Sequence, residues 1–389
     1  MTFPVESFLK LFGDFNPSDV FSTEELTKIA NHLSRKEESE SGLSDKWGNW
    51  DIQFSHEPTE IPHLDRFILQ KLKDKGIERK GIWPNNKTFA VCLSHDVDRV
   101  ESYSATSFLR NLTKRYQHNS SVTGKLKLIP SIVKTAVKKR LTSKSSDPLW
   151  HYEKWIEIET KYDAKSTYFF FVRPQKRDLA VYDCDYSFQD RMIFQGESMN
   201  VAAYIKKLKE LGFEIGLHGS YNTFNDQALF NSQNKKLKKI IQSEITATRQ
   251  HYLHFNIQKT PVVHSNNGIT CDSTIGFNSD IGFRAGTSFP FYIQAEKDYI
   301  LEIPLILMDS ALYFNDKRSL EAAKIEINKI IDEVEQVGGC LTVNFHPDYL
   351  NDERYFGAYE HLLKSVSARN CIFMTMSNIQ KLIQQKCAG

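Results

Sequence analysis

The sequence Leu-Ser-His-Asp-Val-Asp at positions 93–98 constrains this chain more than any other segment. It ends an apolar run over 88–93 that is typical of a buried strand. Carboxylates beside a core are costly unless they are paired, protonated or bound to a metal. If the strand opens into a loop after His95, Asp96 and Asp98 face one site, where one binds a cation and the other handles protons. The alternative interpretation, a turn whose aspartates cap backbone amides, fits this motif equally well.

The length and charge of the chain exclude several classes of protein. With 389 residues it is long enough for one large α/β domain with an accessory segment, or for two domains. Its net charge of +2 does not indicate nucleic-acid binding. No apolar stretch approaches the roughly 20 residues of a transmembrane helix, and residues 1–10 lack the features of a signal peptide. The six cysteines form no CxxC pair, so we expect a cytoplasmic protein without structural disulfides.

Residues 1–86 are predicted to form a helical accessory region. Helices are expected from Thr23 onward and over 64–75, with a polar loop over 37–46 between them. The region shows no residues with an evident chemical role. We therefore expect it to pack against the main domain, which covers 87–389.

From residue 87 onward, strands and helices alternate, which predicts a parallel barrel or a doubly wound sheet. The expected strands cover 88–93, 167–172, 213–217, 300–306, 340–345 and 371–375. The expected helices cover 150–161, 201–211, 233–249, 320–337, 355–366 and 377–385.

An insertion at about 102–148 has a strongly basic composition. Between Glu101 and Asp147 there are ten Lys or Arg residues and no Asp or Glu, with Leu, Ile and Val interleaved. Such a segment can be a solvated helical hairpin, a polyanion-binding surface, or a contact with an anionic membrane. The composition alone leaves these three interpretations open.

Histidines also follow other expected strands. His218 comes just after the strand over 213–217, and Asn222 lies four residues further on, one turn away if the chain is helical there. His346 ends the strand over 340–345, before a proline that stops it. A histidine in this position suits a general acid because its pKa lies near neutrality. A single histidine is nevertheless more often structural than functional.

Two arginines are candidates for supporting roles. Arg249, at the end of the helix expected over 233–249, either holds an aspartate ionised or satisfies the last carbonyls of that helix. Arg284, in a loop-like stretch over 280–287, is a candidate substrate-binding or supporting residue. In all, polar groups follow five successive expected strands, and parallel strands end on one face. Core packing does not readily explain this convergence, which predicts a functional site.

The order of these motifs resembles the polysaccharide deacetylase family, carbohydrate esterase family 4, from about residue 87 to the C-terminus. It is most similar to the divergent branch associated with surface-polysaccharide biosynthesis, which has similar sequences at 94–98, 216–222, 249–253 and 344–347. The resemblance implies a distorted (β/α) barrel with about seven parallel strands. It also implies hydrolysis of N-acyl groups, mostly acetyl, from amino sugars with one divalent metal ion, for which zinc is expected.

By this resemblance, Asp96 corresponds to the catalytic base and Asp98 to the metal-binding aspartate. In the family these two are adjacent, whereas here one residue separates them. His218 matches the first metal-binding histidine. The second is replaced by Asn222, whose amide oxygen is a weaker ligand for zinc than an imidazole.

The Arg-Gln-His-Tyr sequence at 249–252 resembles the family's Arg-x-Pro-Tyr motif. The resemblance implies that Arg249 orients the base and that the backbone N–H of Tyr252 helps to form the oxyanion hole. His251 stands where the family has proline, and it is a candidate for the missing third metal ligand. His346 matches the catalytic histidine, which protonates the leaving amine.

The resemblance therefore implies a metal-dependent N-deacetylase or N-deformylase that acts on an amino sugar of a surface polysaccharide or lipid-linked glycan precursor. Since no secretion signal is visible, the substrate is expected to face the cytoplasm, and the basic segment favours a lipid-linked substrate at the inner membrane. Two alternatives stay open. One is a catalytically degenerate module that binds a glycan or a partner, which the replacement by Asn222 motivates. The other is an amidohydrolase that acts on a non-sugar amide.

Overall fold

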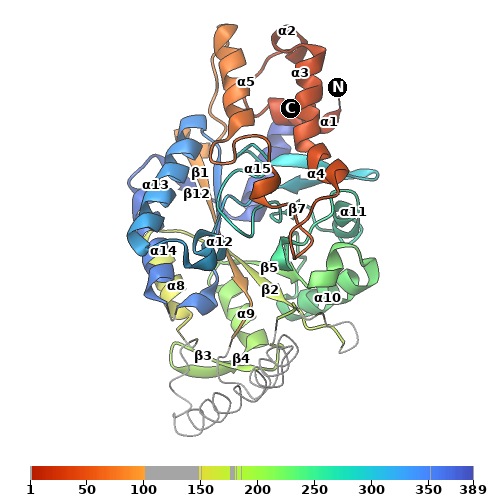
Figure 1. Cartoon of the computed structure of the whole chain (residues 1–389). Coiled ribbons are helices and arrows are strands. Elements are labelled where there is room, and N and C mark those ends of the chain that lie inside the picture. The colour runs from red at the N-terminus through yellow and green to blue at the C-terminus, as the bar shows by residue number, and fades with distance from the viewer. Residues whose placement is uncertain are drawn as a thin grey trace, which may run out of the picture.

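The computed structural model describes residues 2–100, 149, 151–175, 180, 182–184, 186–350 and 352–388. The basic insertion expected at 102–148, with its proposed membrane contact, lies outside these described residues. Figure 1 shows a rounded body of sheet and helices, with the N-terminal helices at one end and a small hairpin at the other. In the described part of the chain, none of the helices is long and apolar enough to span a bilayer.

A curled, mostly parallel sheet forms the centre of the fold. Its strands follow the order β10 (Leu307–Met308), β11 (Cys340–Asn344), β1 (Phe89–Val97), β2 (Thr167–Phe171), β5 (Glu214–Gly219), β6 (Ala247–Gln250), β7 (Cys271–Asp272), β9 (Asp298–Glu302) and β8 (Phe291–Ala295). Neighbouring strands are parallel, except for the antiparallel pair β8 and β9. A further strand, β12 (Cys371–Phe373), pairs with the start of β1. The predicted distorted (β/α) barrel is confirmed.

Helices cover the outside of this sheet (Figure 1). They are α8 (Glu153–Lys161), α9 (Val201–Glu210), α10 (Gln227–Ile241), α11 (Thr260–Ser265), α12 (Asp309–Leu312), α13 (Leu320–Val337), α14 (Glu353–Ser367) and α15 (Met376–Ala388). The bounds of α13 follow from its end residues: the Ser319 side chain caps its first turn, and Gly338 adopts a left-handed conformation after its last. A separate hairpin consists of β3 (Arg191–Phe194) and β4 (Glu197–Asn200).

The N-terminal region packs onto the barrel. Its helices are α1 (Phe3–Leu9), α2 (Pro17–Val20), α3 (Thr23–Leu33), α4 (Lys36–Ser41) and α5 (His63–Asp74). A reciprocal capping box between Ser22 and Glu25 begins α3. The ring of Phe12 packs against the barrel residue Phe289, with 4.6 Å between the ring centres, and the buried Asp65 accepts a hydrogen bond from the backbone N–H of Ser288. The region therefore shares one apolar core with the barrel.

Two expectations about local structure are wrong. The loop expected over 37–46 begins with the helix α4, which an ion pair between Arg35 and Glu38 supports. The helix expected over 233–249 ends at Ile241, because Gln242 takes a left-handed conformation that a helix cannot continue. Arg249 therefore lies in strand β6 and does not satisfy the carbonyls of a helix end.

Candidate active site

Strand β1 brings the two aspartates of the first motif to the same side of the sheet. The strand continues to Val97, so the expected opening of the chain after His95 is wrong. Because side chains alternate along a strand, Asp96 and Asp98 share one face, while His95 points to the other. The imidazole of His95 is fully buried there and contacts a carboxylate oxygen of Glu159 at 2.6 Å. The histidine of this motif is therefore part of the packing outside the site.

Asp98 lies within a group of residues that can hold a metal ion. One ligand atom each from Asp98, Cys184, His218 and His251 lies within 4.8 Å of all the others. The Nε2 atom of His218 is 3.4 Å from Asp98 Oδ1, and the Nε2 atom of His251 is 3.6 Å from Asp98 Oδ2. Two nitrogen or oxygen ligands of one tetrahedral zinc ion lie about 3.4 Å apart. These distances therefore fit a shared divalent ion.

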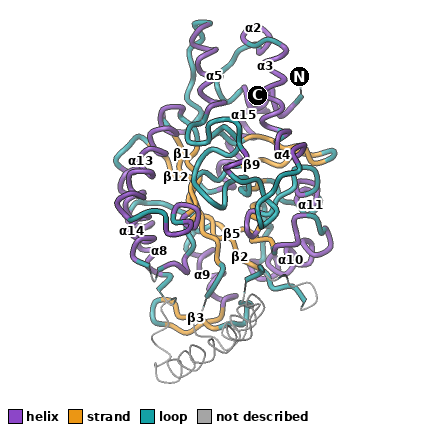
Figure 2. The backbone as a smooth tube through the Cα atoms, in the orientation of Figure 1, coloured by secondary structure: helices purple, strands orange, loops and turns teal. Residues whose placement is uncertain are grey.

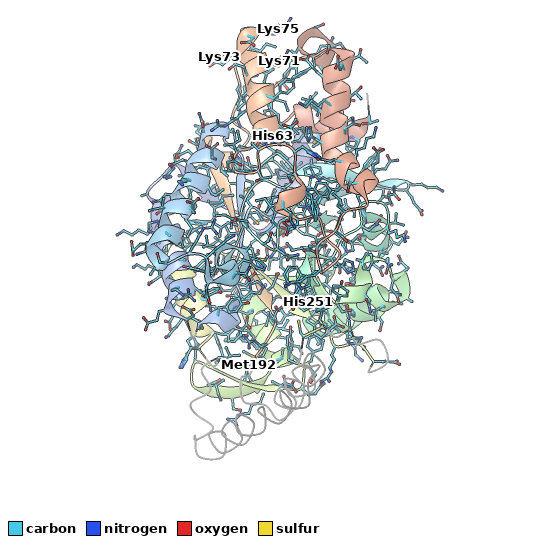
Figure 3. All side chains as sticks on the ribbon, in the orientation of Figure 1. His63, Lys71, Lys73, Lys75, Met192 and His251 are labelled. Carbon is cyan, nitrogen blue, oxygen red and sulfur yellow. The ribbon has the colours of Figure 1, made fainter. Side chains whose placement is uncertain are left out.

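The hydrogen bonds of His218 provide a second test of this fit. Its Nδ1 atom lies 3.0 Å from the carbonyl oxygen of Arg249, which fixes the N–H on that side of the ring. Its buried Nε2 atom makes no hydrogen bond to any residue that the structure describes. An unprotonated imidazole nitrogen that faces a carboxylate and a second imidazole is a typical metal ligand. Figure 3 shows His251 deep in the body of the molecule, far from the lysines at the end of α5.

Asp96 is held as an ionised carboxylate beside this group. Arg249 Nη1 donates to its Oδ1 at 3.0 Å, and Asn344 Nδ2 donates to its Oδ2 at 2.9 Å. The guanidinium is fixed in turn by the backbone and side-chain oxygens of Ser273 and by the ring of Phe169. Burial raises the pKa of Asp96, but the charges of Arg249, His218 and His346 together lower it by more, so the net shift is downward. This orientation by Arg249 is what the resemblance implied.

His346 has the opposite charge state. Its Nδ1 atom contacts Asp309 Oδ1 at 2.6 Å, and its backbone N–H donates to Asp309 Oδ2 at 2.7 Å. Burial lowers the pKa of His346, but Asp309 raises it more, with a further contribution from Asp98, to about 10. The imidazolium therefore has a proton available at neutral pH, and its Nε2 atom lies 3.9 Å from Asp98 Oδ2.

Tyr252 has a strained backbone, with φ of 57° and ψ of 20°. The left-handed region is costly for residues other than glycine and persists where neighbours enforce it. Two amide side chains do so here: Asn49 and Asn278 donate to the Tyr252 carbonyl oxygen at 2.8 and 2.9 Å. The peptide group that follows Tyr252 is therefore held in one orientation.

These groups meet at the floor of one cavity of about 420 Å³, which is lined by Asp96, Asp98, His218, His251 and His346, among others. Such a volume is typical of small-molecule sites. Figure 2 shows β5 and β2 of the central sheet between α14 on one side and α10 on the other.

Two predicted site residues lie outside this cavity. Asn222 is exposed in the short 3-10 helix Tyr221–Phe224 and is not among the residues that line the cavity. The guanidinium of Arg284 is buried and donates to Glu38 at 2.9 and 3.0 Å and to the Gly276 carbonyl at 2.8 Å. We therefore leave Asn222 and Arg284 out of the site proposed below.

Three site residues had no assigned role in the sequence. Cys184 lies in a loop, and its thiol is 3.5 Å from Asp98 Oδ1. Asp309 begins α12, directly after the short strand β10. Asn344 is the last residue of β11, so its position two residues before His346 was the one available signal.

The contacts of Glu38 predict a pH-dependent loss of stability. Its carboxylate is 12% exposed and bridges Arg35 and Arg284. Burial raises the pKa of Glu38, but Arg284 and then Arg35 lower it more, to about 2. Glu38→Gln leaves two arginines without their partner, and we expect it to lower the free energy of unfolding at pH 7 by about 2 kcal/mol.

Because the folded-state pKa is depressed, this stabilisation is present above about pH 4.5 and is lost as the pH falls toward 2. Urea unfolding at several pH values measures it. The difference between wild type and Glu38→Gln shrinks toward low pH, and a difference that grows instead would contradict this account. The control is Glu40→Gln, which alters an exposed ion pair on the same helix and leaves stability unchanged.

Comparison with known proteins identifies the fold. A solved structure assigned to the polysaccharide deacetylases, from Mycobacterium smegmatis, aligns with a TM-score of 0.51 and 16% identity, over 78% of this chain and 93% of that one. The chain has the polysaccharide deacetylase fold. No family model matches the sequence, and no curated protein matches it significantly. The resemblance that the motifs indicated is therefore confirmed as a likeness of fold.

Two more distant structures have the same general description. One, from Pseudomonas aeruginosa PAO1, is 10% identical over 81% of this chain and 97% of that one, with a TM-score of 0.48. The other, described as involved in O-antigen biosynthesis in Bordetella bronchiseptica, is 13% identical over 78% and 93%, with a TM-score of 0.37. In this chain, the polysaccharide deacetylase fold carries the metal-binding group, Asp96 and His346 in one cavity.

Proposed function

We propose that this protein is a metal-dependent hydrolase that removes an N-acetyl or N-formyl group from an amino sugar of a surface polysaccharide or lipid-linked glycan precursor. One observation carries the proposal. A metal-binding group, an ionised carboxylate and a protonated imidazole lie together in one cavity. Hydrolysis of an amide needs an activated water, stabilisation of the oxyanion and a proton for the leaving amine.

Asp98, His218 and His251 would hold the divalent ion, and their oxygen and nitrogen donors suit zinc. When bound, such an ion lowers the pKa of a water and polarises a carbonyl. Asp96 takes the proton from the attacking water, with Arg249 and Asn344 holding its carboxylate ionised and oriented.

The remaining steps fall to two other residues. The backbone N–H of Tyr252 donates to the developing oxyanion, because the enforced conformation of this residue fixes its direction. His346 gives its proton to the leaving amine, and Asp309 keeps the imidazole oriented and charged until then. Base and acid are thus two groups whose environments move their pKa values in opposite directions.

The thiol of Cys184 favours a second candidate function. Catalytic zinc sites have three protein ligands and an open position, whereas structural sites have four. With Cys184 as a fourth ligand the site would be closed, and the protein would be a binding module that does not catalyse hydrolysis. The Cys184→Ser variant separates the two candidates. If this variant hydrolyses the substrate as wild type does, the thiol is not an essential ligand and the hydrolase is supported.

Metal content is the first measurement to make. Protein purified without chelators or a histidine tag is expected to contain about one equivalent of zinc or another divalent metal by mass spectrometry. His218→Ala removes the ligand with the free buried Nε2, and we expect its metal content to fall at least tenfold.

The matched control for this measurement is His361→Ala. His361 lies on α14 and contacts Asn328 at 3.0 Å, outside the group that could hold a metal. This variant should keep its metal. If wild type binds no divalent ion after reconstitution, or if His218→Ala binds as much as wild type, the proposed metal site is wrong.

We further propose a cytoplasmic enzyme that reaches a lipid-linked precursor at the inner membrane surface. The basic segment at 102–148 supports this, since ten Lys or Arg without an intervening acid attract anionic lipid headgroups. The hydrolysis of a non-sugar amide remains the alternative, because a metal ion, a base and an acid can act on any amide.

A further inference from the structure

The N-terminal region contributes a wall to the cavity. The segment 45–50 has the sequence Asp-Lys-Trp-Gly-Asn-Trp, and the side chain of Trp47 lines the same cavity as Asp96 and His346. No motif of the barrel predicted this, because the segment lies about forty residues before β1 begins with Phe89 in the sequence. The region that was expected only to pack against the barrel therefore reaches the site.

The segment 45–50 is held in place by hydrogen bonds within itself and to Tyr221 and Tyr252. Asp45 Oδ1 accepts from the backbone N–H groups of Trp47 and Asn49 at 2.8 and 2.9 Å. The hydroxyl of Tyr221 donates to the Trp47 carbonyl at 3.0 Å, and Asn49 donates to the Tyr252 carbonyl at 2.8 Å. Its conformation is thus fixed by the elements that carry the catalytic groups.

Trp47 differs from the other tryptophans that the structure describes. Trp50, Trp83 and Trp155 are all buried, with exposed fractions of 4% or less. Trp47 is only half-buried, and its ring lies 5.8 Å from the ring of Tyr252, at an angle of 31°. Core packing does not require a large ring at the mouth of a polar cavity, whereas sugar recognition uses one.

The surroundings of Trp47 form an aromatic wall above the polar floor. The ring of Phe314 lies 6.1 Å from the ring of Trp47 and edge-on to the indole. The cavity is also lined by Tyr313, Tyr349 and Tyr355. Binding sites typically combine such walls with a few polar groups that fix orientation. The face of a pyranose ring that carries axial C–H groups is apolar and matches the face of an indole.

One group already contacts the indole. The Nζ atom of Lys46 lies 4.3 Å from the centre of the ring. Lys46 is exposed, and an exposed cation–π contact stabilises by only about 0.5–1 kcal/mol. A sugar ring that buries the indole can therefore displace this ammonium.

We infer that Trp47 is the stacking platform for a pyranose ring of the substrate, so that the N-terminal region selects a glycan over simple amides. The inference rests on the proposed function for the same site and adds a residue that selects the substrate. It assigns Trp47 to substrate binding and gives it no part in proton transfer.

The test measures kcat and KM of metal-loaded protein with a tetramer of N-acetylglucosamine. We expect Trp47→Ala to raise KM at least tenfold, with kcat changed less than threefold, and Trp47→Phe to restore most of the loss. Tyr299→Ala removes an exposed aromatic ring on β9, and it should change neither constant. If Trp47→Ala lowers kcat with KM unchanged, the indole only supports Tyr252 and the inference is overturned.

A binding measurement separates this inference from the proposed function. Calorimetry with the Asp96→Asn protein and the same tetramer requires no turnover. Binding that weakens at least tenfold when Trp47 is also replaced supports the platform, even if wild type hydrolyses nothing. Equal binding with and without Trp47, or no binding of the tetramer at all, overturns the platform, and the metal analysis then decides separately on the hydrolase.

Discussion

Replacing Asp96 with asparagine is expected to lower kcat about 10³-fold, within the range found for loss of a general base. Asparagine has the same shape but does not take a proton from water at neutral pH. Asp96 is outside the group of possible metal ligands, so the variant should still contain about one equivalent of metal. The decisive measurement is therefore turnover per bound metal, with an N-acyl amino sugar as substrate.

Two controls test whether a lower kcat of Asp96→Asn comes from unfolding or from an unspecific effect of the substitution. Arg249 is fully buried and loses a charged partner in the variant, so circular dichroism must show that the protein is folded at the assay temperature. The exposed residue Asp298 at the start of β9 provides a matched control, and Asp298→Asn should behave as wild type. If Asp96→Asn keeps more than a tenth of the wild-type kcat, Asp96 is not the base.

The replacement of Arg249 by methionine has the largest expected effect on stability. The guanidinium is buried with an exposed fraction of 0% and donates to Asp96, Ser94 and Ser273. Removing one partner of a buried ion pair leaves a charge without compensation and costs about 3–5 kcal/mol. Urea unfolding at pH 7 measures this as a lower free energy of unfolding.

The same variant should change the dependence of activity on pH. Because Arg249 lowers the pKa of Asp96, its loss raises that pKa, and the acidic limb of the kcat/KM profile moves to higher pH. Arg369→Met removes an arginine that pairs with Asp332 and Glu335 on the surface, and it should leave the profile unchanged. A profile for Arg249→Met with an unmoved acidic limb would show that Arg249 does not hold the base ionised.

Local sequence patterns predicted the parts of the site that lie at the ends of strands. Asp98 follows β1, His218 lies in β5 and His251 follows β6. Because β1, β5 and β6 run parallel in one sheet, with β2 between β1 and β5, their ends meet at one edge. The apolar runs over 88–93 and 213–217 were sufficient to find that edge for Asp98 and His218. His251 was named only through the family resemblance, because a helix was expected where β6 lies.

The supporting residues could not be predicted in this way. Cys184 reaches the site from a loop, where no periodic pattern gives its direction. Asp309 acts only through contact with His346, 37 residues away in the sequence. Asn222 was misleading for a related reason: its spacing of four from His218 matters only if both face one side of a helix, and β5 ends at Gly219 between them.

The contact between Asn49 and Tyr252 spans 203 residues of sequence. During synthesis, the N-terminal helices leave the ribosome long before their partners on β6 and its following turn exist. Asn49 can hold the conformation of Tyr252 only after the two residues have met, which closes a loop of about 200 residues. The cavity is therefore completed late in folding. A nascent chain therefore has no competent site until most of the barrel has been made.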